Sequence, residues 1–471
     1  MSRPLHLHED RLLPTEPGVR AIARRLLRGV AQLPIISPHG HTDPAWFSSN
    51  EPFSDPASLL VTPDHYLLRM LYSQGIALES LGVAPRGATA QGADPRAIWR
   101  LFARHYHLFR GTPSRLWLDW VFSEVFGLRV CLDGDTADDH FDSITAQLKL
   151  PAFRPRSLFE RFNIEVLATT ESPLDPLQHH RALRLSGWNG RIITAFRPDP
   201  VVDPDYEGFR DNLSSLSALT GEDCHSYPGY LAALRQRRAY FALHGATSTD
   251  HGHPTAATAD LGEPEALALF ARISTRPASA ADAELFRAHM LTVMAGMSLD
   301  DGLVMQLHPG AWRNHNASLF ARYGRDRGAD IPMRTDFVRA LKPLLDRHGN
   351  DPGLTLILFT LDESAYAREL APLAGHYPAL KLGPAWWFHD SPEGMRRLRR
   401  QVTETAGFCN TVGFNDDTRA FCSIPARHDV ARRIDCGYLA ELVAGHQLDE
   451  SEAHELARDL AYGLAKRAYR L

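Results

Sequence analysis

Residues 33–41 read LPIISPHGH, a short apolar run followed at once by two histidines. A run of this length, bounded by Pro and Gly, is typical of a buried β-strand. Because alternate residues of an extended chain point to the same side, the imidazoles of His39 and His41 converge on one point. Neutral imidazole is a common ligand of divalent metal ions, so the stretch predicts a strand that ends in a metal site. Taken alone, the pair is equally compatible with histidines that hydrogen-bond a loop.

Seven similar runs follow the first, and helical patterns separate most of them. The eight predicted strands are residues 33–38, 164–170, 191–196, 240–243, 303–307, 354–361, 380–387 and 411–415. Amphipathic helices are expected between them, for example over residues 283–297, 335–347 and 394–405. Eight alternations of strand and helix predict one α/β domain over residues 1–471, a (β/α)8 barrel of the TIM type. The alternative is an open, doubly wound sheet of six or seven strands.

The connection between the first two strands, residues 47–161, is far too long for a simple crossover. Its pattern is helical: Thr62 suits a helix cap, Pro63 suits the first helical position, and an apolar stripe begins at Tyr66. Active sites of barrels lie at the C-terminal ends of the strands, which is where this segment starts. We therefore predict an inserted helical subdomain that forms a lid or wall for the active site.

A polar or ionisable group follows every predicted strand. In strand order these groups are His39 and His41, residues 169–171, Arg197, His244, His308, residues 362–363, residues 386–389 and residues 416–419. The C-terminal ends of the strands of a closed barrel meet on one face. The eight groups together therefore predict a ring of functional side chains around one pocket.

Asp417 is the natural third metal ligand, because strand eight of a closed barrel lies beside strand one. Asp416 is its rival, since adjacent side chains of an extended chain point in opposite directions and only one should face inward. Either residue is also compatible with an ordinary solvated turn. A carboxylate at this position could transfer protons as well as bind metal.

Arginines at the strand ends indicate an acidic substrate. A guanidinium can bind a carboxylate through two parallel hydrogen bonds, and Arg197 and Arg419 follow strands three and eight. Arg313 is a third candidate. The alternative for the first two is an ion pair with a neighbouring acid, Asp199 or Asp416.

Aromatic residues supply further candidates. His65 and Tyr66 lie in the first turn of a predicted helix, where a helix N-terminus would lower the pKa of a phenol and suit it to proton transfer. Tyr66 is also compatible with a core position in its apolar stripe. Alternation along strand seven would turn one of Trp386 and Trp387 toward a sugar ring and the other away.

Composition excludes several classes of function. The net charge is −5 without a basic block, so neither nucleic acid nor an anionic membrane is an expected partner. The five cysteines are scattered without a CxxC motif, which argues against disulfides and a zinc ribbon and favours the reducing cytoplasm. Neither a secretory signal nor an apolar stretch of about 18 residues is present.

An ordered series of motifs resembles the uronate isomerase family, also called glucuronate isomerases, an outlying branch of the amidohydrolase superfamily. The motifs are PHGH (38–41), DHY (64–66), RPD (197–199), HPGAWRNHN (308–316), WWF (386–388) and DTR (417–419). The HxH pair alone is unspecific, whereas the series in this order is highly specific. The resemblance covers nearly the whole chain, and it implies a barrel with a helical insertion.

The resemblance also implies a metal site and a proton-transfer pair. One divalent metal ion, with zinc the expected ion, would be bound by His39, His41 and Asp417. Tyr66 and Asp417 would transfer protons. Since Asp416 precedes the expected acid, the choice between the two acids stays open.

The implied substrates are D-glucuronate, giving D-fructuronate, and D-galacturonate, giving D-tagaturonate, through an enediol. The residues that we expect to bind them are His65, Arg197, His308, Arg313, Trp386 and Arg419. Whether His308 binds the substrate or the metal stays open, as do the metal's identity and the preferred uronate. Association into a homo-oligomer is compatible with the sequence.

Three other functions remain open at this stage. A metal-dependent hydrolase of the same superfamily, such as a lactonase or deaminase, is the leading alternative. Such relatives commonly add a lysine on strand four or further histidines, whereas this chain offers only His244 and His308. A sugar-acid binding protein without activity and a barrel that uses no metal are the remaining alternatives.

Overall fold

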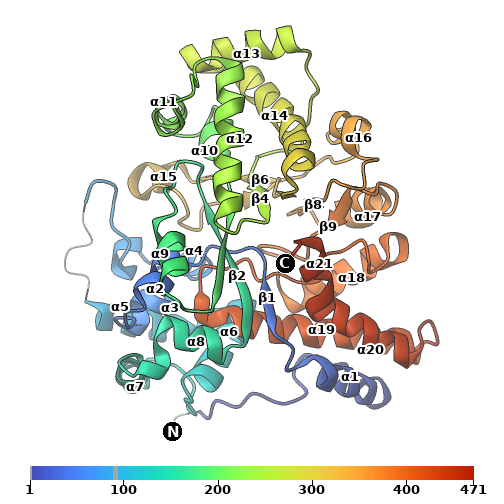
Figure 1. Cartoon of the computed structure of the whole chain (residues 1–471). Coiled ribbons are helices and arrows are strands. Elements are labelled where there is room, and N and C mark those ends of the chain that lie inside the picture. The colour runs from blue at the N-terminus through green and yellow to red at the C-terminus, as the bar shows by residue number, and fades with distance from the viewer. Residues whose placement is uncertain (1–2, 89–93) are drawn as a thin grey trace.

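Seven parallel strands form one curled sheet in the computed structural model, which describes residues 3–88 and 94–471. The strands are β1 (Ile35–Ser37), β2 (Ile164–Glu171), β3 (Arg191–Phe196), β4 (Ser248–His251), β5 (Val304–Leu307), β8 (Leu356–Leu358) and β9 (Leu380–Leu382). They are hydrogen-bonded in this order, and each neighbouring pair is parallel. The arrangement confirms the predicted TIM-type barrel (Figure 1).

The eighth position of the barrel is held by a single parallel bridge between Leu382 and Thr411. On its other side, the segment after Thr411 contacts the end of the first strand: the backbone N–H of His41 donates a 3.1 Å hydrogen bond to the carbonyl of Thr418. Strand eight is therefore shorter than the predicted 411–415, and strand seven ends at Leu382 instead of residue 387. The barrel closes through these few contacts and not through a long ladder.

The predicted fourth strand, residues 240–243, is wrong. These residues form the last turn of the helix α12 (Tyr227–Leu243), His244 caps it, and Gly245 leaves it with a φ of +96°. The true fourth strand, β4, starts at Ser248. Residues 240–243 are one turn of a long helix in which Phe241 is buried whereas Leu243 is 67% exposed, and an apolar run of four cannot be distinguished from a short strand by periodicity alone.

The connection between β1 and β2 is helical in its described residues, as predicted; residues 89–93 lie outside the described chain. Its helices are α2 (Pro44–Ser49), α3 (Pro56–Leu60), α4 (His65–Tyr72), α5 (Pro95–His105), α6 (Pro113–Trp120), α7 (Ala137–Leu148) and α8 (Pro155–Arg161). The helix predicted from Thr62 starts later, because the carboxylate of Asp64 accepts hydrogen bonds from the N–H groups of Tyr66 and Leu67.

Several helices pack against the outside of the sheet (Figure 1): α9 (Gln178–Leu185) and α12 on β3, α14 (Ala280–Asp301) on β5, α17 (Ala371–Ala374) on β9 and α19 (Ile424–Ala444) on β1. The other helices outside the insertion are α1 (Pro17–Val30), α10 (Asp199–Val202), α11 (Phe209–Thr220), α13 (Glu263–Thr275), α15 (Ala317–Tyr323), α16 (Lys342–His348), α18 (Pro392–Ala406), α20 (Glu450–Arg458) and α21 (Leu464–Ala468). A short antiparallel ribbon consists of β6 (Ala311–Trp312) and β7 (Ile331–Pro332). The helices predicted over 283–297 and 394–405 are confirmed, whereas only the second half of 335–347 is helical.

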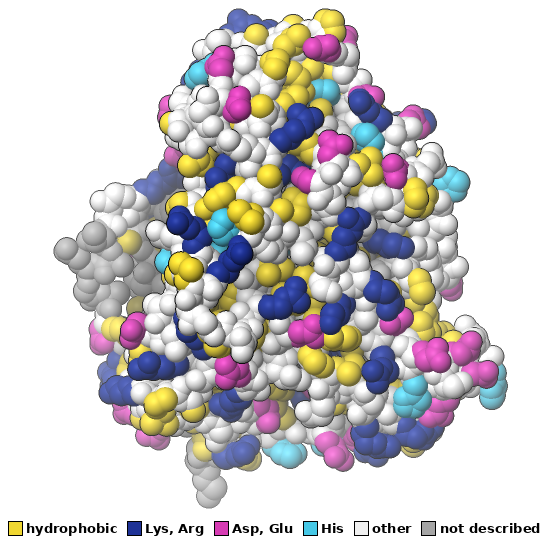
Figure 2. All heavy atoms as spheres, viewed as in Figure 1, with side chains coloured by type: hydrophobic (Ala, Val, Ile, Leu, Met, Phe, Trp, Pro, Cys, Tyr) yellow, Lys and Arg dark blue, Asp and Glu magenta, His cyan; other side chains and the backbone are white. Residues whose placement is uncertain are grey.

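The surface and the cysteines agree with the composition. Acidic, basic and hydrophobic side chains are intermingled on the face shown in Figure 2. All five cysteines are free, and four of them are buried. Among the described residues, no helix is both long and apolar enough to span a bilayer.

The last residue of β2 buries a carboxyl group. Glu171 is 9% exposed, and the hydroxyl of Thr194 donates a hydrogen bond to its Oε2. Burial raises the pKa of Glu171 from 4.5 to about 7. Between these two values the folded chain binds this proton more tightly than the unfolded chain does. The free energy of unfolding therefore falls as the pH rises through this window.

Replacing Glu171 by Gln removes the charge and keeps an oxygen for Thr194. We expect Glu171→Gln to gain stability relative to the wild type between pH 5 and pH 8, by on the order of 3 kcal/mol, since one pKa unit corresponds to about 1.4 kcal/mol. Urea unfolding across this range measures the difference, and parallel stability curves would contradict the assignment.

Glu165 on the same strand provides the control. Although burial acts in the opposite direction, hydrogen bonds from Lys466 and Tyr462 lower the pKa of Glu165. Its carboxylate is therefore stabilised by folding. Glu165→Gln should lose stability relative to the wild type as the pH rises toward 4.5, which is the opposite sign, and its stability curve should run parallel to that of the wild type between pH 5 and pH 8.

Candidate active site

The strand ends surround one cavity of about 1090 Å³. Every residue that the sequence assigns to the site lines it: His39, His41, His65, Tyr66, Arg197, His308, Arg313, Trp386, Asp417 and Arg419. His244 and Asp416, which the sequence also placed at strand ends, do not line it, and His244 is in fact the cap of α12. Side chains from the insertion and from the barrel thus meet at the predicted face.

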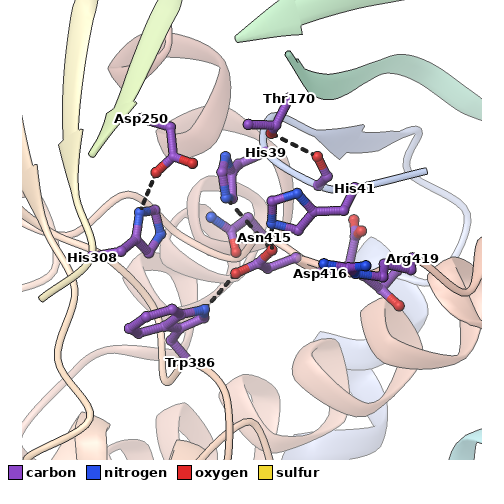
Figure 3. A network of polar contacts seen from close by, with 12 residues as sticks. His39, His41, Thr170, Asp250, His308, Trp386, Asn415, Asp416 and Arg419 are labelled. Atoms are coloured by element: carbon purple, nitrogen blue, oxygen red, sulfur yellow. Dashed lines mark hydrogen bonds and ion pairs between the residues drawn. The ribbon is translucent and has the colours of Figure 1, made fainter. Parts of the chain in front are cut away.

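Asp417 contacts the two histidines of the first strand end, His39 and His41, whose rings lie next to each other in Figure 3. Its Oδ1 is 3.2 Å from Nε2 of His41 and 3.5 Å from Nε2 of His39. The loop that carries the histidines is held by Thr170, whose hydroxyl donates a 2.8 Å hydrogen bond to the carbonyl of Gly40. Two strands that are far apart in the sequence therefore present three potential metal ligands to one point.

The two neighbouring acids of strand eight have different surroundings. Asp416 is buried with its Oδ2 3.1 Å from Nε2 of His428 on α19. Asp417 adopts a φ of +36°, which is unusual for a residue other than glycine, and Trp386 donates a hydrogen bond from Nε1 to its Oδ2. Asp417 is thus the acid that faces the histidines.

The donor set fits a divalent cation. Ligand atoms of His39, His41 and Asp417 all lie within 4.8 Å of one another. Two imidazoles and one carboxylate are ligands that zinc and similar ions accept. Within the described chain, Oδ1 of Asp417 and Nδ1 of His39 are buried without a hydrogen-bond donor or acceptor. The site therefore contains a cluster that could hold a metal ion.

Electrostatics favour the ligating form of Asp417. Burial alone would raise the pKa of Asp417, but the contacts with His39 and His41 outweigh it and hold the pKa well below its usual range. Burial lowers the pKa of His41, against the opposing effect of Asp417. The ionised carboxylate is the form in which Asp417 can bind a metal ion.

A second group of potential ligands, His39, Asp250 and His308, shares one histidine with the first. Its carboxylate is already engaged, because Asp250 contacts Nδ1 of His308 at 2.7 Å and Nη1 of Arg197 at 3.0 Å. A cation placed there would face the guanidinium of Arg197. The group around Asp417 is therefore the better cation site.

The sequence motif Asp250-His251 also matches the family, but Asp250 received no role in the predicted site because the fourth strand was placed at residues 240–243 and not at β4. The strand that carries Asp250 is short, and the β-branched residue Thr249 directly before it is the signal that could have revealed this strand. Asp250 is completely buried, and its carboxylate contacts both Arg197 and His308.

The arginines line the cavity while paired with acids. Arg197 forms a 2.8 Å ion pair with Asp199, which is the alternative partner expected from the sequence. Arg419 pairs with Asp326 at 3.2 Å and not with Asp416. Its Nε is buried without an acceptor in the described chain.

Arg313 follows the same pattern. Its Nη1 lies 3.1 Å from Oδ2 of Asp330, and its guanidinium lies over the ring of Trp387 at 5.1 Å. Trp387 also contacts His65 edge-on, with 5.5 Å between the ring centroids. Of the two tryptophans, Trp386 contacts Asp417 and Trp387 forms the aromatic wall beside His65.

Tyr66 is neutral, and the expected lowering of its pKa is wrong. Its ring is buried, and its hydroxyl donates a 2.8 Å hydrogen bond to Oδ2 of Asp390. Burial and the neighbouring carboxylate raise the pKa of Tyr66 well above its usual value. For His65, burial and the charge of Arg419 lower the pKa to about 3, so that imidazole is neutral as well.

Comparison with known proteins gives one consistent result. A model of the glucuronate isomerase family matches residues 9–469. A curated uronate isomerase of Rhizorhabdus wittichii is 73% identical over 468 residues, which is 99% of each chain. The hydrolase alternative is not favoured by these matches.

Solved structures agree. The crystal structure of glucuronate isomerase from Caulobacter crescentus superposes with a TM-score of 0.98 at 62% identity, covering 99% of this chain and 98% of the other. The uronate isomerase of Thermotoga maritima superposes with a TM-score of 0.91 at 26% identity, covering 98% and 99%. With its barrel, its ring of strand-end residues and a sequence match over almost its full length, the chain belongs to the uronate isomerase family of enzymes.

Proposed function

We propose that the enzyme interconverts D-glucuronate with D-fructuronate and D-galacturonate with D-tagaturonate through an enediol. The observation that carries this proposal is the contact of the Asp417 carboxylate with His39 and His41, in a cavity that also contains Arg197 and Arg419. His39, His41 and Asp417 would hold one divalent ion, and zinc suits two imidazoles and a carboxylate. Such an ion, when bound, supplies Lewis-acid polarisation of a sugar oxygen.

The arginines supply the recognition of an acid. Arg419 lines the cavity, its Nε is buried without an acceptor, and Asp326 is its only ion-pair partner in the described chain. Arg419 can therefore accept a second carboxylate, whereas Arg197 is held in position by Asp199 and Asp250. We assign the uronate carboxylate to these two arginines, with Arg419 as the stronger contact.

The proton carriers differ in protonation state, which suits different tasks. Asp417 is ionised and can take the proton from the sugar carbon, while the neutral Tyr66 serves a sugar oxygen. His65, His308, Arg313 and Trp386 complete the wall that would hold the sugar. Since His65 and Tyr66 belong to α4, we propose that the insertion, residues 47–161, closes the active site as a wall.

Asp417→Asn tests the proposed roles of Asp417 as metal ligand and proton carrier together, and it keeps the side chain's shape. The wild type should convert either uronate to its 2-keto acid in D₂O, observed by proton NMR. The variant should be slower by about 100-fold or more, the usual range for loss of a general base. The neighbouring Asp416→Asn is the control and should retain more activity, because Asp416 contacts His428 and does not line the cavity. A metal-loaded wild type that converts neither uronate would refute the proposed substrates.

Metal content separates the two groups of potential ligands. We expect about one equivalent of divalent metal in the wild type and a large loss in His41→Ala and Asp417→Asn, since each removes a ligand. His308→Ala should retain the ion. Elemental analysis of the dialysed proteins measures this, and metal that follows His308 instead of Asp417 would place the ion in the second group.

Arg419→Lys tests recognition of the carboxylate. A lysine keeps the charge and loses the planar pair of donors, so KM for the uronate should rise by about tenfold, equivalent to about 1.4 kcal/mol. Arg399→Lys is the control, because Arg399 pairs with Asp435 outside the cavity. Steady-state kinetics with each uronate measure KM for both variants. An unchanged KM for Arg419→Lys would assign the carboxylate elsewhere.

A further inference from the structure

Behind the cavity, a buried acid holds the hydroxyl of Tyr66. Tyr66 comes from α4, whereas Asp390 lies in the loop before α18 and does not line the cavity. The phenolic O–H donates a 2.8 Å hydrogen bond to Oδ2 of Asp390. Because this hydrogen bond turns the phenolic proton toward Asp390, the lone pairs of the phenol oxygen are left for a group in the cavity.

Asp390 is fixed in turn by an arginine from a third element. Arg427 on α19 is 3% exposed, and its Nη1 donates a 2.8 Å hydrogen bond to Oδ2 of Asp390. The same Nη1 lies 3.3 Å from the backbone carbonyl of Asp416, the residue before Asp417. The guanidinium also lies over the ring of Trp117, with 3.5 Å to its centroid. Arg427 therefore connects the support of Tyr66 to the end of strand eight.

One oxygen of Asp390 is not engaged. Oδ1 is buried and has no hydrogen-bond donor within the described chain. A buried acid that only balanced the charge of Arg427 would be expected to place both oxygens on donors. Here the arginine and the phenol share Oδ2, so the carboxylate is arranged around the phenol's proton as well as around the guanidinium.

We propose that Asp390, held by Arg427, is a positioning residue that directs the proton transfer between the two sugar oxygens by Tyr66. This inference rests on the role proposed for Tyr66 above. In the step, the O–H bond at C2 of the sugar breaks and its proton forms a new O–H bond on Tyr66, while the original phenolic proton moves to Oδ2 of Asp390. The reverse movement delivers a proton to the oxygen at C1, and both side chains return to their starting state.

The charges around the pair support this order of events. Burial would lower the pKa of Arg427, but Asp390 and Tyr66 outweigh it, so the guanidinium stays charged. Tyr66 starts as a neutral phenol, as its raised pKa requires. A phenol that passes its proton to Asp390 while it receives another never becomes a tyrosinate. This avoids placing two negative charges, a tyrosinate and a carboxylate, side by side in a buried position.

A double-mutant cycle on the holoenzyme tests the proposal. Asp390→Asn should lower kcat by about 10- to 100-fold with KM changed less than about twofold, because it disturbs a proton transfer and not substrate contacts. Tyr66→Phe should lower kcat at least as much. In the Tyr66→Phe background, Asp390→Asn should cause little further loss, since both changes remove the same function.

The control is Asp435→Asn, which removes an equally buried acid from Arg399 on α18. It should lower thermal stability as Asp390→Asn does and leave kcat within about twofold. The proposal is overturned if Asp390→Asn affects kcat no more than Asp435→Asn does, or if the two losses multiply in the double mutant.

Two further outcomes are distinguishable. Wild-type kcat in Tyr66→Phe would refute the role proposed for Tyr66 itself, whereas a slow Tyr66→Phe with a fast Asp390→Asn refutes only the present inference. If Asp390→Asn does not fold, the cycle is run with Asp390→Glu, which keeps the charge and displaces it by one methylene. A reduced kcat that disappears in the Tyr66→Phe background supports the proposal, and a wild-type kcat in Asp390→Glu overturns it.

Discussion

The contact of one carboxylate with two imidazoles is the interaction on which the active site depends. Asp417 reaches His39 and His41 only because the barrel closes between strands eight and one, and that closure is made by few backbone hydrogen bonds. The left-handed backbone at Asp417 turns its side chain into the cavity and leaves Asp416 to pair with His428. A residue other than glycine in this conformation costs on the order of 1 kcal/mol or more, which the surrounding contacts must offset.

The other site residues are connected to this centre through an ion pair, hydrogen bonds and ring stacking. Asp250 joins Arg197 to His308, the ring of His308 stacks on His39 with 4.8 Å between centroids, and Trp386 donates to Asp417. The acids hold the arginines in fixed orientations instead of cancelling them. This explains how a chain of net charge −5 can present a binding site for an acid.

Much of the fold and of the site could be predicted from sequence, for a physical reason. Parallel barrel strands are short apolar runs, and their functional residues follow directly, so HGH, HPGAW and WWF mark strand ends without a structure. The predicted strand at residues 240–243 is wrong because this apolar turn of α12 has the composition of a strand, and the true fourth strand, which carries Asp250, was therefore not predicted. The pKa shift predicted for Tyr66 is wrong too, because the helix N-terminus lowers a phenol's pKa less than burial beside Asp390 raises it. Asp390 and Arg427 are invisible in sequence because their contact joins a loop to a helix 37 residues away.

The most direct test of this account is anomalous X-ray diffraction at the zinc edge from crystals of the zinc-loaded protein. The account predicts one strong peak at bonding distance, about 2.0–2.2 Å, from His39, His41 and Asp417, with Asp416 remaining on His428. A peak bound by Asp250 and His308, or by Asp416, would contradict it. The carboxylate at the closing seam of the barrel would then not be the centre of the site.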